Sequence, residues 1–435
     1  MRKTTRKMWA AAAGVTGIAL LATACSSGSG EGSDDDESEG GNITLTVATF
    51  NEFGYTDELF AEYETANPGI TIEHKKAATS NEARENLNTR LAAGSGLSDI
   101  EAIEVDWLPE LLQYPDKFVD LNSDEVEGRW LDWKAAQATT ADGKLIGYGT
   151  DIGPEAIAYR SDLFAAAGLP TDRAEVAALL SENGGGWDQY FKIGKQYVDA
   201  TGKPWFDSAG AVWQGMINQE EAPYEDPSDN TVTAADNPRI KEIYDQVVQA
   251  AATDNLSAHL QQWSDDWNAA FQSPDNAFAT MLAPGWMLGV IENNSAGVTG
   301  WDIADVFPGG AGNWGGSFLT VPEQGAHTEE AKKLAAWLTA PEQQLKAYAD
   351  KGTFPSQLEA LESDELLSST NEFFNNAPAG EILANRAKGI TTVYKGPNFF
   401  AVNDAFNNAL VEVDVNGGNP AEQWDAAIQA VSALG

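Results

Sequence analysis

The sequence predicts an α/β protein in which helices flank largely parallel β-sheets. Between residues 43 and 105, three segments with strand patterns alternate with two segments of helical periodicity. Strands that are separated by helices in this way usually lie parallel within one sheet. A chain of 435 residues is also long enough for two or three domains with substantial cores.

Local patterns specify the first elements. Apolar residues alternate with threonines from residue 43 to about residue 50, which predicts a half-buried strand. Thr56 is expected to cap the helix that follows, and Asn67-Pro68-Gly69 to end it. The next elements are expected in this order: a strand from residue 70, a helix around 83–91 and a strand over 100–105.

The rest of the chain is predicted to be rich in helices, with one clear strand near 318–321. Helical periodicity, capping residues and terminating glycines or prolines mark these segments. The helices are expected from residue 161, over 187–198, over 238–252, over 328–338, over 341–351, near 400–411 and near 420–433.

The charge balance is strongly acidic. The chain has 26 Lys and Arg residues against 66 Asp and Glu residues, a formal net charge of −40. Such a surface repels nucleic acids and anionic lipids, so the sequence argues against a nucleic-acid-binding role. The single cysteine excludes an internal disulfide and any multi-cysteine metal site.

The N-terminus has the pattern of an export signal. Four cationic residues, an apolar run and small residues predict a signal peptide over residues 1–24. The stretch Leu21-Ala22-Thr23-Ala24-Cys25 resembles a bacterial lipobox, in which Cys25 would carry acyl chains such as palmitate and anchor the chain to the outer face of the cytoplasmic membrane. An ordinary signal peptide with an incidental cysteine is the alternative. The acidic, Gly/Ser-rich residues 25–41 predict a disordered linker.

Patterns for catalysis and cofactor binding are weak. Gly310, Gly312 and Gly315 have the spacing of a dinucleotide fingerprint, but a strand rather than a helix is expected after them. The three histidines lie far apart and lack metal-ligand spacing. We therefore expect no cofactor and no metal. A pair of catalytic carboxylates stays open, because their spacing is set in space rather than in sequence.

Polar residues beside aromatic residues follow several predicted strands. They are Asn51-Glu52-Phe53, Asp106-Trp107 and the segment 149–154, which contains Asp151. Ligands of open α/β sheets bind beyond the carboxyl ends of the strands, which favours a site here. The alternative for each segment is a loop without a role. Trp314, in the stretch PGGAGNWGGSF, is a further candidate because its small neighbours leave the indole little to pack against.

Several segments resemble, in order, those of one known family. They include ANPGITIE, AIEVDWLPEL, APGWMLG, FPGGAGNWGGSFLTVP and TFPSQ, and the similarity spans nearly all of residues 42–435. The family is that of extracellular solute-binding lipoproteins that deliver sugars to ATP-binding-cassette (ABC) importers, the group that includes maltose-binding protein. The segment TFNEFGY and its surroundings are most similar to actinobacterial binders of cello-oligosaccharides.

The resemblance implies a two-lobe periplasmic-binding-protein fold. Each lobe would be a mainly parallel sheet flanked by helices, and the chain would cross between the lobes at a hinge. One lobe would take residues 42–150 and 315–355, and the other residues 151–314 and 356–435. The lobes would close around a sugar. The resemblance further implies a monomer without catalysis, which passes its ligand to the membrane permeases of an importer.

The resemblance also implies which residues bind sugar. An indole offers a rigid plane for the C–H face of a pyranose, while carboxylates and amides pair with its hydroxyls. Trp286 is aligned with a sugar-stacking aromatic residue of the family. The other expected ligand-binding residues are Asn51, Glu52, Phe53, Asp106, Trp107, Asp151, Trp205, Asp207, Trp314, Gly316, Ser317, Asn398 and Phe399. Core packing is expected for Trp130, Trp337 and Trp424, and the roles of Trp187, Trp263 and Trp267 stay open.

The expected ligand is a β-1,4-linked gluco-oligosaccharide, cellobiose or cellotriose, because of the resemblance around TFNEFGY. The flat ribbon of such a chain suits indoles from opposite lobes, although the sequence does not give the angles between them. An α-glucoside or chitobiose is the alternative ligand. A glycoside-active enzyme on the cell surface and a structural or adhesive lipoprotein are the alternative functions.

Overall fold

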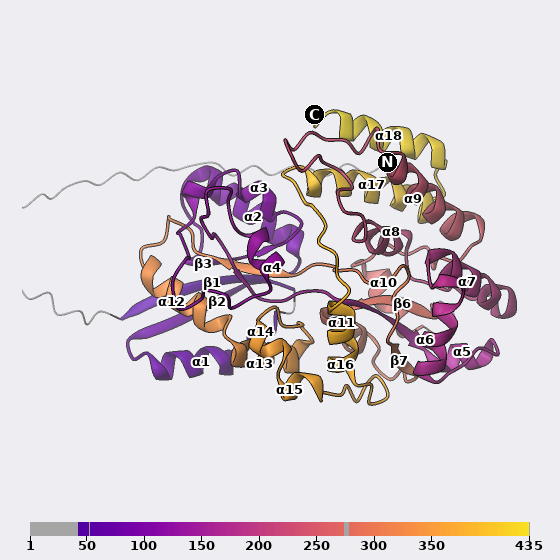
Figure 1. Cartoon of the computed structure of the whole chain (residues 1–435), viewed down its shortest axis with the longest axis horizontal. Coiled ribbons are helices and arrows are strands. Elements are labelled where there is room, and N and C mark those ends of the chain that lie inside the picture. The colour runs from indigo at the N-terminus through magenta and orange to yellow at the C-terminus, as the bar shows by residue number, and fades with distance from the viewer. Residues whose placement is uncertain (1–41, 52, 274–277, 435) are drawn as a thin grey trace, which may run out of the picture. The chain divides into compact units, whose positions relative to one another are not determined.

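Two β-sheets organise the chain, and the α/β fold class is confirmed (Figure 1). The computed structural model describes residues 42–51, 53–273 and 278–434. The first sheet has the strand order β2 (Ile70–Ala77), β1 (Ile43–Phe50), β3 (Ile100–Glu104), β8 (Ser317–Thr320) and β4 (Tyr148–Gly149). The second sheet has the order β6 (Thr280–Pro284), β5 (Glu155–Arg160) and β7 (Trp301–Ala304).

Helices pack against both sheets, and several begin at residues with capping side chains. At the start of the first helix, for example, the Thr56 hydroxyl accepts a hydrogen bond from the Leu59 amide at 3.2 Å, as the sequence predicts. The helices are α1 (Asp57–Ala66), α2 (Ser80–Ala93), α3 (Leu108–Leu111), α4 (Asp132–Gln137), α5 (Ser161–Ala166), α6 (Arg173–Ser181), α7 (Trp187–Thr201), α8 (Ala209–Ile217), α9 (Pro238–Val248), α10 (Asp265–Ala270), α11 (Gly285–Asn294), α12 (Thr328–Leu338), α13 (Pro341–Lys351), α14 (Leu358–Leu361), α15 (Asp364–Leu367), α16 (Ala379–Ala387), α17 (Phe399–Asp414) and α18 (Pro420–Ser432).

The strand directions differ from the expectation of mainly parallel sheets. In the first sheet β1 pairs in parallel with β2 and β3, whereas β8 is antiparallel to both β3 and β4. In the second sheet both described pairings are antiparallel, so the prediction is wrong there. The reason is the course of the chain. Strand β5 starts at Glu155, at one end of the sheet. Both β6 and β7 run towards that end, so that Pro284 at the end of β6 pairs with Glu155.

Three clusters of buried hydrophobic side chains form the core. One is drawn from residues 45–148 and 318–347 and includes the inner side chains of the first sheet. The other two are drawn from residues 152–431 and lie on opposite faces of the second sheet, because Ile157 and Tyr159 belong to one cluster and Ala156 and Ala158 to the other. Residues 42–435 form one compact unit. The division of this unit into two lobes stays a prediction.

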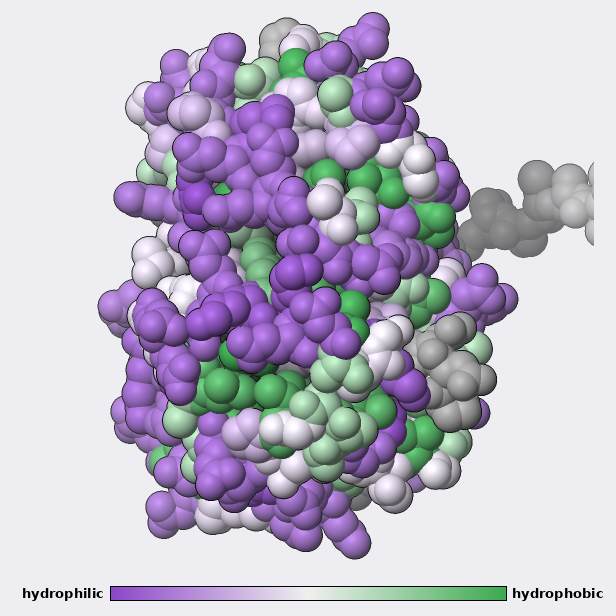
Figure 2. Space-filling view, turned by 90° about the vertical axis from the view of Figure 1, so that its right-hand side faces the viewer, coloured by the Kyte–Doolittle hydropathy of each residue, from purple (hydrophilic) through white to green (hydrophobic). Residues whose placement is uncertain are grey.

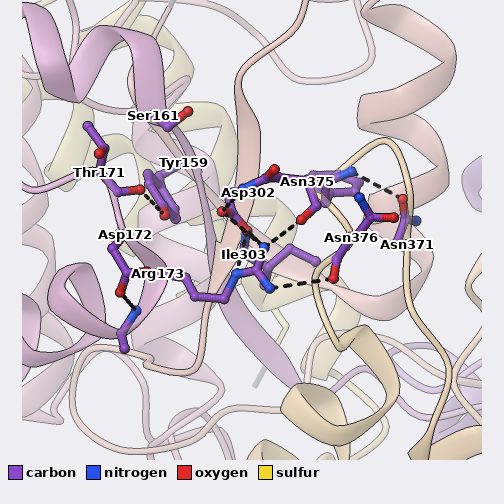
Figure 3. Close-up of polar contacts among 12 residues, drawn as sticks. Tyr159, Ser161, Thr171, Asp172, Arg173, Asp302, Ile303, Asn371, Asn375 and Asn376 are labelled. Atoms are coloured by element: carbon purple, nitrogen blue, oxygen red, sulfur yellow. Dashed lines mark hydrogen bonds and ion pairs between the residues drawn. The ribbon is translucent and has the colours of Figure 1, made fainter.

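An ion pair ties the second sheet to the segment before α16. Arg173, at the start of α6, donates from Nε and Nη2 to the carboxylate of Asp302 in β7, at 3.0 and 3.2 Å. The same Nη2 donates to the carbonyl oxygen of Asn375 at 2.8 Å. Figure 3 shows the guanidinium between Asp302 and the turn at Asn375 and Asn376. Because Asp302 is almost fully buried, this contact fixes the turn against β7.

The face in Figure 2 is mainly hydrophilic, with hydrophobic side chains gathered in a smaller area of its lower half. Among the helices of the described residues, none is both long and apolar enough to cross a membrane.

Candidate ligand-binding site

A cavity of about 920 Å³ lies beside the carboxyl ends of strands in both sheets. This volume is at the upper end of the range for small-molecule sites. Its walls include residues that follow β1 and β3 and the start of α11. They also include residues 150–151 and 314–317, which belong to the two crossing segments where the chain passes from one sheet to the other. The strand ends that the sequence singled out thus meet in one place.

Eight of the residues expected to bind ligand line this cavity. They are Asn51, Phe53, Asp106, Asp151, Trp286, Trp314, Gly316 and Ser317. Glu52 and Cys25 lie outside the described residues. The other five expected residues are not in the cavity wall: Trp107, Trp205, Asp207, Asn398 and Phe399.

Three indoles form a connected aromatic surface in the cavity. The rings of Trp263 and Trp286 are stacked, with centroids 6.0 Å apart and planes at 28°. The ring of Trp314 meets Trp286 edge-on, at 5.5 Å and 84°. Trp286 Nε1 also donates to the carbonyl oxygen of Trp314 at 3.0 Å. The contact and the hydrogen bond hold two of the three indoles in a fixed relation before any ligand binds.

Trp263 is the most exposed of the three, and its backbone is unusual. Its exposed fraction is 45%, and its φ angle is +70°, a left-handed conformation that bulky residues rarely adopt. Such strain is most often kept at functional sites. The sequence left the role of Trp263 open, and the structure places this residue in the cavity wall.

The glycines around Trp314 allow its backbone to pass close to the crossing segment 150–154. A Cβ atom on Gly153 would lie only 2.6 Å from the carbonyl carbon of Trp314, and one on Gly316 would lie 2.8 Å from the carbonyl oxygen of Asp151. Gly316 also has a φ angle of +108°, which side chains disfavour. The glycine-rich stretch thus brings two backbones together so that the indole can face the cavity.

A buried carboxylate anchors this crossing. Asp151 Oδ1 accepts hydrogen bonds from the Ser317 amide and the Thr150 hydroxyl, both at 2.8 Å. Burial raises the pKa of Asp151, while the nearby Lys134 ammonium lowers it. Burial also lowers the pKa of Lys134 to about 7, and its Nζ lies 3.7 Å from the centre of the Phe318 ring. Asp151 thus fixes the segment 150–154 to the segment 314–317 and lines the cavity.

A second charged group lies after β3. Asp106 forms an ion pair with Lys395, whose Nζ also lies 4.6 Å from the centre of the Phe399 ring. The Asp106 amide donates to Glu104 Oε2 at 2.7 Å. Burial and the Asp106 carboxylate together raise the pKa of Glu104. Both carboxyl groups line the cavity and offer acceptors for ligand hydroxyls, whereas Lys395 is absent from the cavity wall.

Two of the expected tryptophans are core residues instead. Trp205 is fully buried and stacks on Phe164, with centroids 5.4 Å apart. Trp107 is almost fully buried, and its Nε1 donates to the Ser80 hydroxyl at 3.0 Å. Trp107 comes just after β3, and Trp205 lies between α7 and α8. Tertiary packing directs both indole rings into the core rather than into the cavity. Trp130 is buried as expected, and Trp337 and Trp424 pack against the core.

Asp207 lies behind the cavity wall and does not line the cavity itself. It is almost fully buried and accepts hydrogen bonds from Trp267 Nε1 and Gln262 Nε2, both at 2.8 Å. Burial raises its pKa to about 6. Because Gln262 and Trp263 line the cavity, Asp207 holds in place the loop that carries them. Trp267 and Trp187 are buried, each with its indole N–H bonded to a side chain, Asp207 and Gln219 respectively.

The expected contacts at Asn398 and Phe399 are displaced by one residue. Asn398 donates to Glu225, and the buried Phe399 packs on Tyr224 with centroids 5.0 Å apart. The next side chain, Phe400, lines the cavity instead, with the guanidinium carbon of Arg84 4.2 Å above its ring. Helix α17 begins here, and each step along a helix turns the side chain by about 100°. Phe399 and Phe400 therefore face different sides.

Other functional candidates were missed because no strand end marks them. They are Gln262 in the loop before α10 and Asn403, Asp404, Asn407 and Asn408 on α17. The spacing of the α17 residues, with amides on an otherwise apolar helix, is a signal that could have identified them. Within the described residues, no cluster of three or more His, Cys, Asp or Glu side chains has the arrangement of a metal site.

Glu155 is a buried carboxyl group without a counter-charge in contact. It begins β5, its side chain is fully buried, and neither carboxyl oxygen has a hydrogen-bond partner among the described residues. Burial raises its pKa well above the ordinary value, and Lys395 opposes this only partly. Burial without a hydrogen-bond partner therefore favours the protonated form of Glu155 in the folded chain.

This state predicts a pH-dependent stability difference between the protein and its Glu155→Gln variant. A carboxyl group whose pKa is raised by folding stabilises the fold most below its unfolded pKa of about 4.3, and the stabilisation is lost as the pH rises towards the folded pKa. We expect the melting temperature of the native protein to fall relative to the variant between pH 4 and pH 8. Thermal unfolding of both proteins across this range measures the difference. The variant Glu372→Gln, at an exposed position, controls for loss of a charge. A constant difference would mean that Glu155 ionises normally.

Comparisons with known proteins agree with this architecture. A family model described as a bacterial extracellular solute-binding protein matches residues 58–375. A crystal structure of a family 1 extracellular solute-binding protein is 50% identical and covers 90% of this chain and 99% of its own, with a TM-score of 0.80. An arabinooligosaccharide-binding protein of Bacillus subtilis is 23% identical, over 86% of this chain and 88% of its own. A protein with the same description from Halalkalibacterium halodurans is 26% identical, but the match spans only 58% of this chain and 56% of that protein. The predicted periplasmic-binding-protein fold is thereby confirmed.

Proposed function

Since the chain belongs to the family of bacterial extracellular solute-binding proteins, we propose that it captures a neutral oligosaccharide in the indole-lined cavity and delivers it to an ABC importer. The observation that carries the proposal is the connected surface of Trp263, Trp286 and Trp314 beside buried carboxylates. Aromatic planes suit the apolar faces of pyranose or furanose rings, and the carboxylates suit their hydroxyls. Two relatives described as arabinooligosaccharide-binding proteins support an oligosaccharide as the ligand.

We propose that the protein binds the saccharide without catalysing a reaction on it. The relatives that this chain matches are solute-binding proteins rather than enzymes. The carboxylates in the cavity are also already engaged, since Asp151 anchors the crossing segment and Asp106 pairs with Lys395. A binding protein uses such groups to orient hydroxyls. Membership of the family supports a location outside the cytoplasm, and we propose that the protein works there as a monomer beside the membrane permeases.

The sugar itself is proposed as a β-1,4-linked gluco-oligosaccharide, cellobiose or cellotriose. This choice depends on the resemblance of TFNEFGY, whose Asn51 and Phe53 line the cavity. An arabino-oligosaccharide is a second candidate, favoured by the descriptions of the two relatives. The stacked pair Trp263 and Trp286 is compatible with the flat faces of either sugar chain.

A calorimetric panel tests both levels of the proposal. Cellobiose, cellotriose, arabinobiose, arabinotriose, maltose, xylobiose and chitobiose are titrated into the purified protein, and the tightest ligand is then incubated for a day and analysed for products. We expect one ligand bound per monomer, recovered intact. Binding of maltose or chitobiose at least tenfold tighter than cellobiose, about 1.4 kcal/mol, would exclude the β-glucoside. Steady release of shorter sugars would indicate a glycosidase instead.

Attachment to the membrane is proposed to depend on Cys25. Two acyl chains on one residue suffice for a stable anchor, and a chain without them leaves the membrane. In cells that produce the Cys25→Ser variant, we expect the protein in the medium or as unprocessed precursor. Detergent partitioning and the mass of the N-terminal peptide measure the outcome. Recovery of fully acylated protein from the variant would exclude the lipobox interpretation.

A further inference from the structure

One face of α17 lines the same cavity as the indole cluster. Leu410 and Asp414 also line the cavity, and six further lining residues recur every three or four positions, which is the spacing of a single helical face: Phe400, Asn403, Asp404, Asn407, Asn408 and Val411. From the first to the last, this face extends about 17 Å along the helix axis at 1.5 Å per residue. We call this face the α17 track.

The track is polar but nearly uncharged. Three of its side chains are amides, and Asp404 is the only ionisable residue among the six. Amides both donate and accept hydrogen bonds, so they pair with hydroxyl groups of any orientation. A charged ligand would find few partners of opposite sign here. The chemistry of the track therefore matches neutral sugar units.

Buried contacts hold the track in place. The Asn403 Oδ1 atom accepts hydrogen bonds from Trp213 Nε1 at 3.2 Å and from the Tyr224 hydroxyl at 2.8 Å. Its Nδ2 atom donates to Gln214 Oε1 at 3.0 Å, and Gln214 also lines the cavity. Further along, the contact is exposed: Asn408 Nδ2 donates to Asp404 at 3.0 Å. These amides are oriented before a ligand arrives, which lowers the entropy cost of binding.

The track continues into the indole cluster at its C-terminal end. Asp414, the last residue of α17, accepts from the Ser257 hydroxyl at 2.8 Å and pairs with His259 Nδ1 at 2.8 Å. The loop that follows His259 carries Gln262 and Trp263 in the cavity wall. The start of α2 also contributes Ser80 and its neighbours to the same cavity.

From this continuity we infer that the α17 track is an extension of the binding site, which binds the third and later units of an oligosaccharide and so selects ligands by chain length. The inference depends on the proposed function. The indoles bind the apolar faces of the first rings, and the amides of the track bind hydroxyls of the units that follow. Longer oligosaccharides then bind more tightly than the disaccharide of the same linkage.

Calorimetric titration with two series tests this inference: cello-oligosaccharides and arabino-oligosaccharides of two to five units. In the series that binds, we expect the dissociation constant to fall at least tenfold between two and four units. The Asn407→Ala variant should reduce this ratio to about threefold or less. The Gly210→Leu variant should reduce it further, because a Cβ on Gly210 would already lie 3.5 Å from Asn407 Oδ1 and a longer side chain would extend into the track.

The Asn416→Ala variant is the matched control, since Asn416 is exposed beyond the end of α17 and is absent from the cavity wall. It should keep the native ratio. Equal binding of two and four units by the native protein would overturn the inference and leave the proposed function standing. A tenfold ratio that persists in both Asn407→Ala and Gly210→Leu would also overturn it. Failure of every saccharide in both series to bind would overturn the proposed function and this inference together.

Discussion

Replacing Trp286 with alanine is expected to weaken saccharide binding by about 1–3 kcal/mol, or roughly 5- to 150-fold. Trp286 is the central member of the aromatic surface, because it stacks on Trp263 and meets the edge of Trp314. Its removal takes away one stacking plane and leaves the Trp314 carbonyl oxygen without the 3.0 Å hydrogen bond from the indole. Both losses act on binding, so the change should appear in the dissociation constant measured by calorimetry.

The variant Trp286→Phe separates the two contributions. It keeps an aromatic plane but cannot donate to the Trp314 carbonyl, so binding close to that of the native protein would assign the energy to stacking. The variant Trp337→Ala serves as the matched control, because Trp337 is a partly buried tryptophan that packs on Tyr63 and is absent from the cavity wall. It should lower stability and spare affinity. If Trp286→Ala unfolded the protein at the assay temperature, or bound the ligand normally, Trp286 would be a structural residue.

The parts of the fold that depend on local pattern were predictable from the sequence. The first strand, the Thr56 cap and the helices over 328–338 and 341–351 lie where periodicity and capping residues place them. Strand direction was not predictable in the second sheet. The direction of β6 and β7 depends on the return of distant segments to the edge at Glu155, and no local pattern records such a return.

The same distinction holds for the candidate site. Asp106 was predictable because it comes just after β3, and Asp151 because it lies in the short segment between β4 and β5. Both therefore lie at strand ends that line the cavity. Trp205 was assigned to the site from its residue type, yet packing against Phe164 buries it. Trp263 reaches the cavity through a strained loop, and a left-handed tryptophan cannot be anticipated from its neighbours in sequence.

Replacing Gly153 with alanine is expected to damage both the fold and the site, at a cost of about 3 kcal/mol of stability or more. A Cβ atom there would overlap the Trp314 carbonyl group, with its carbon only 2.6 Å away. The obstacle is backbone, so no side-chain rotation can relieve it. Gly153 and Trp314 are also joined directly, since the Trp314 amide donates to the Gly153 carbonyl at 2.8 Å and the Gly153 amide donates to Asn313 Oδ1 at 2.9 Å.

The backbone displacement caused by Gly153→Ala should also weaken saccharide binding. The Trp314 carbonyl that the new methyl group pushes away is also the acceptor for Trp286 Nε1, so two indoles shift together. Saccharide affinity should fall at least as far as in Trp286→Ala, accompanied by a lower melting temperature. Gly186→Ala is the matched control, because a Cβ on Gly186 meets no atom within 4 Å and its φ of −84° suits alanine. Because Gly186 is the N-cap of α7, where alanine is less favourable than glycine, the control should lower stability by about 1 kcal/mol or less and leave affinity unchanged. Native affinity in Gly153→Ala would show that the crossing segment tolerates the methyl group and that the position of Trp314 does not depend on this close approach.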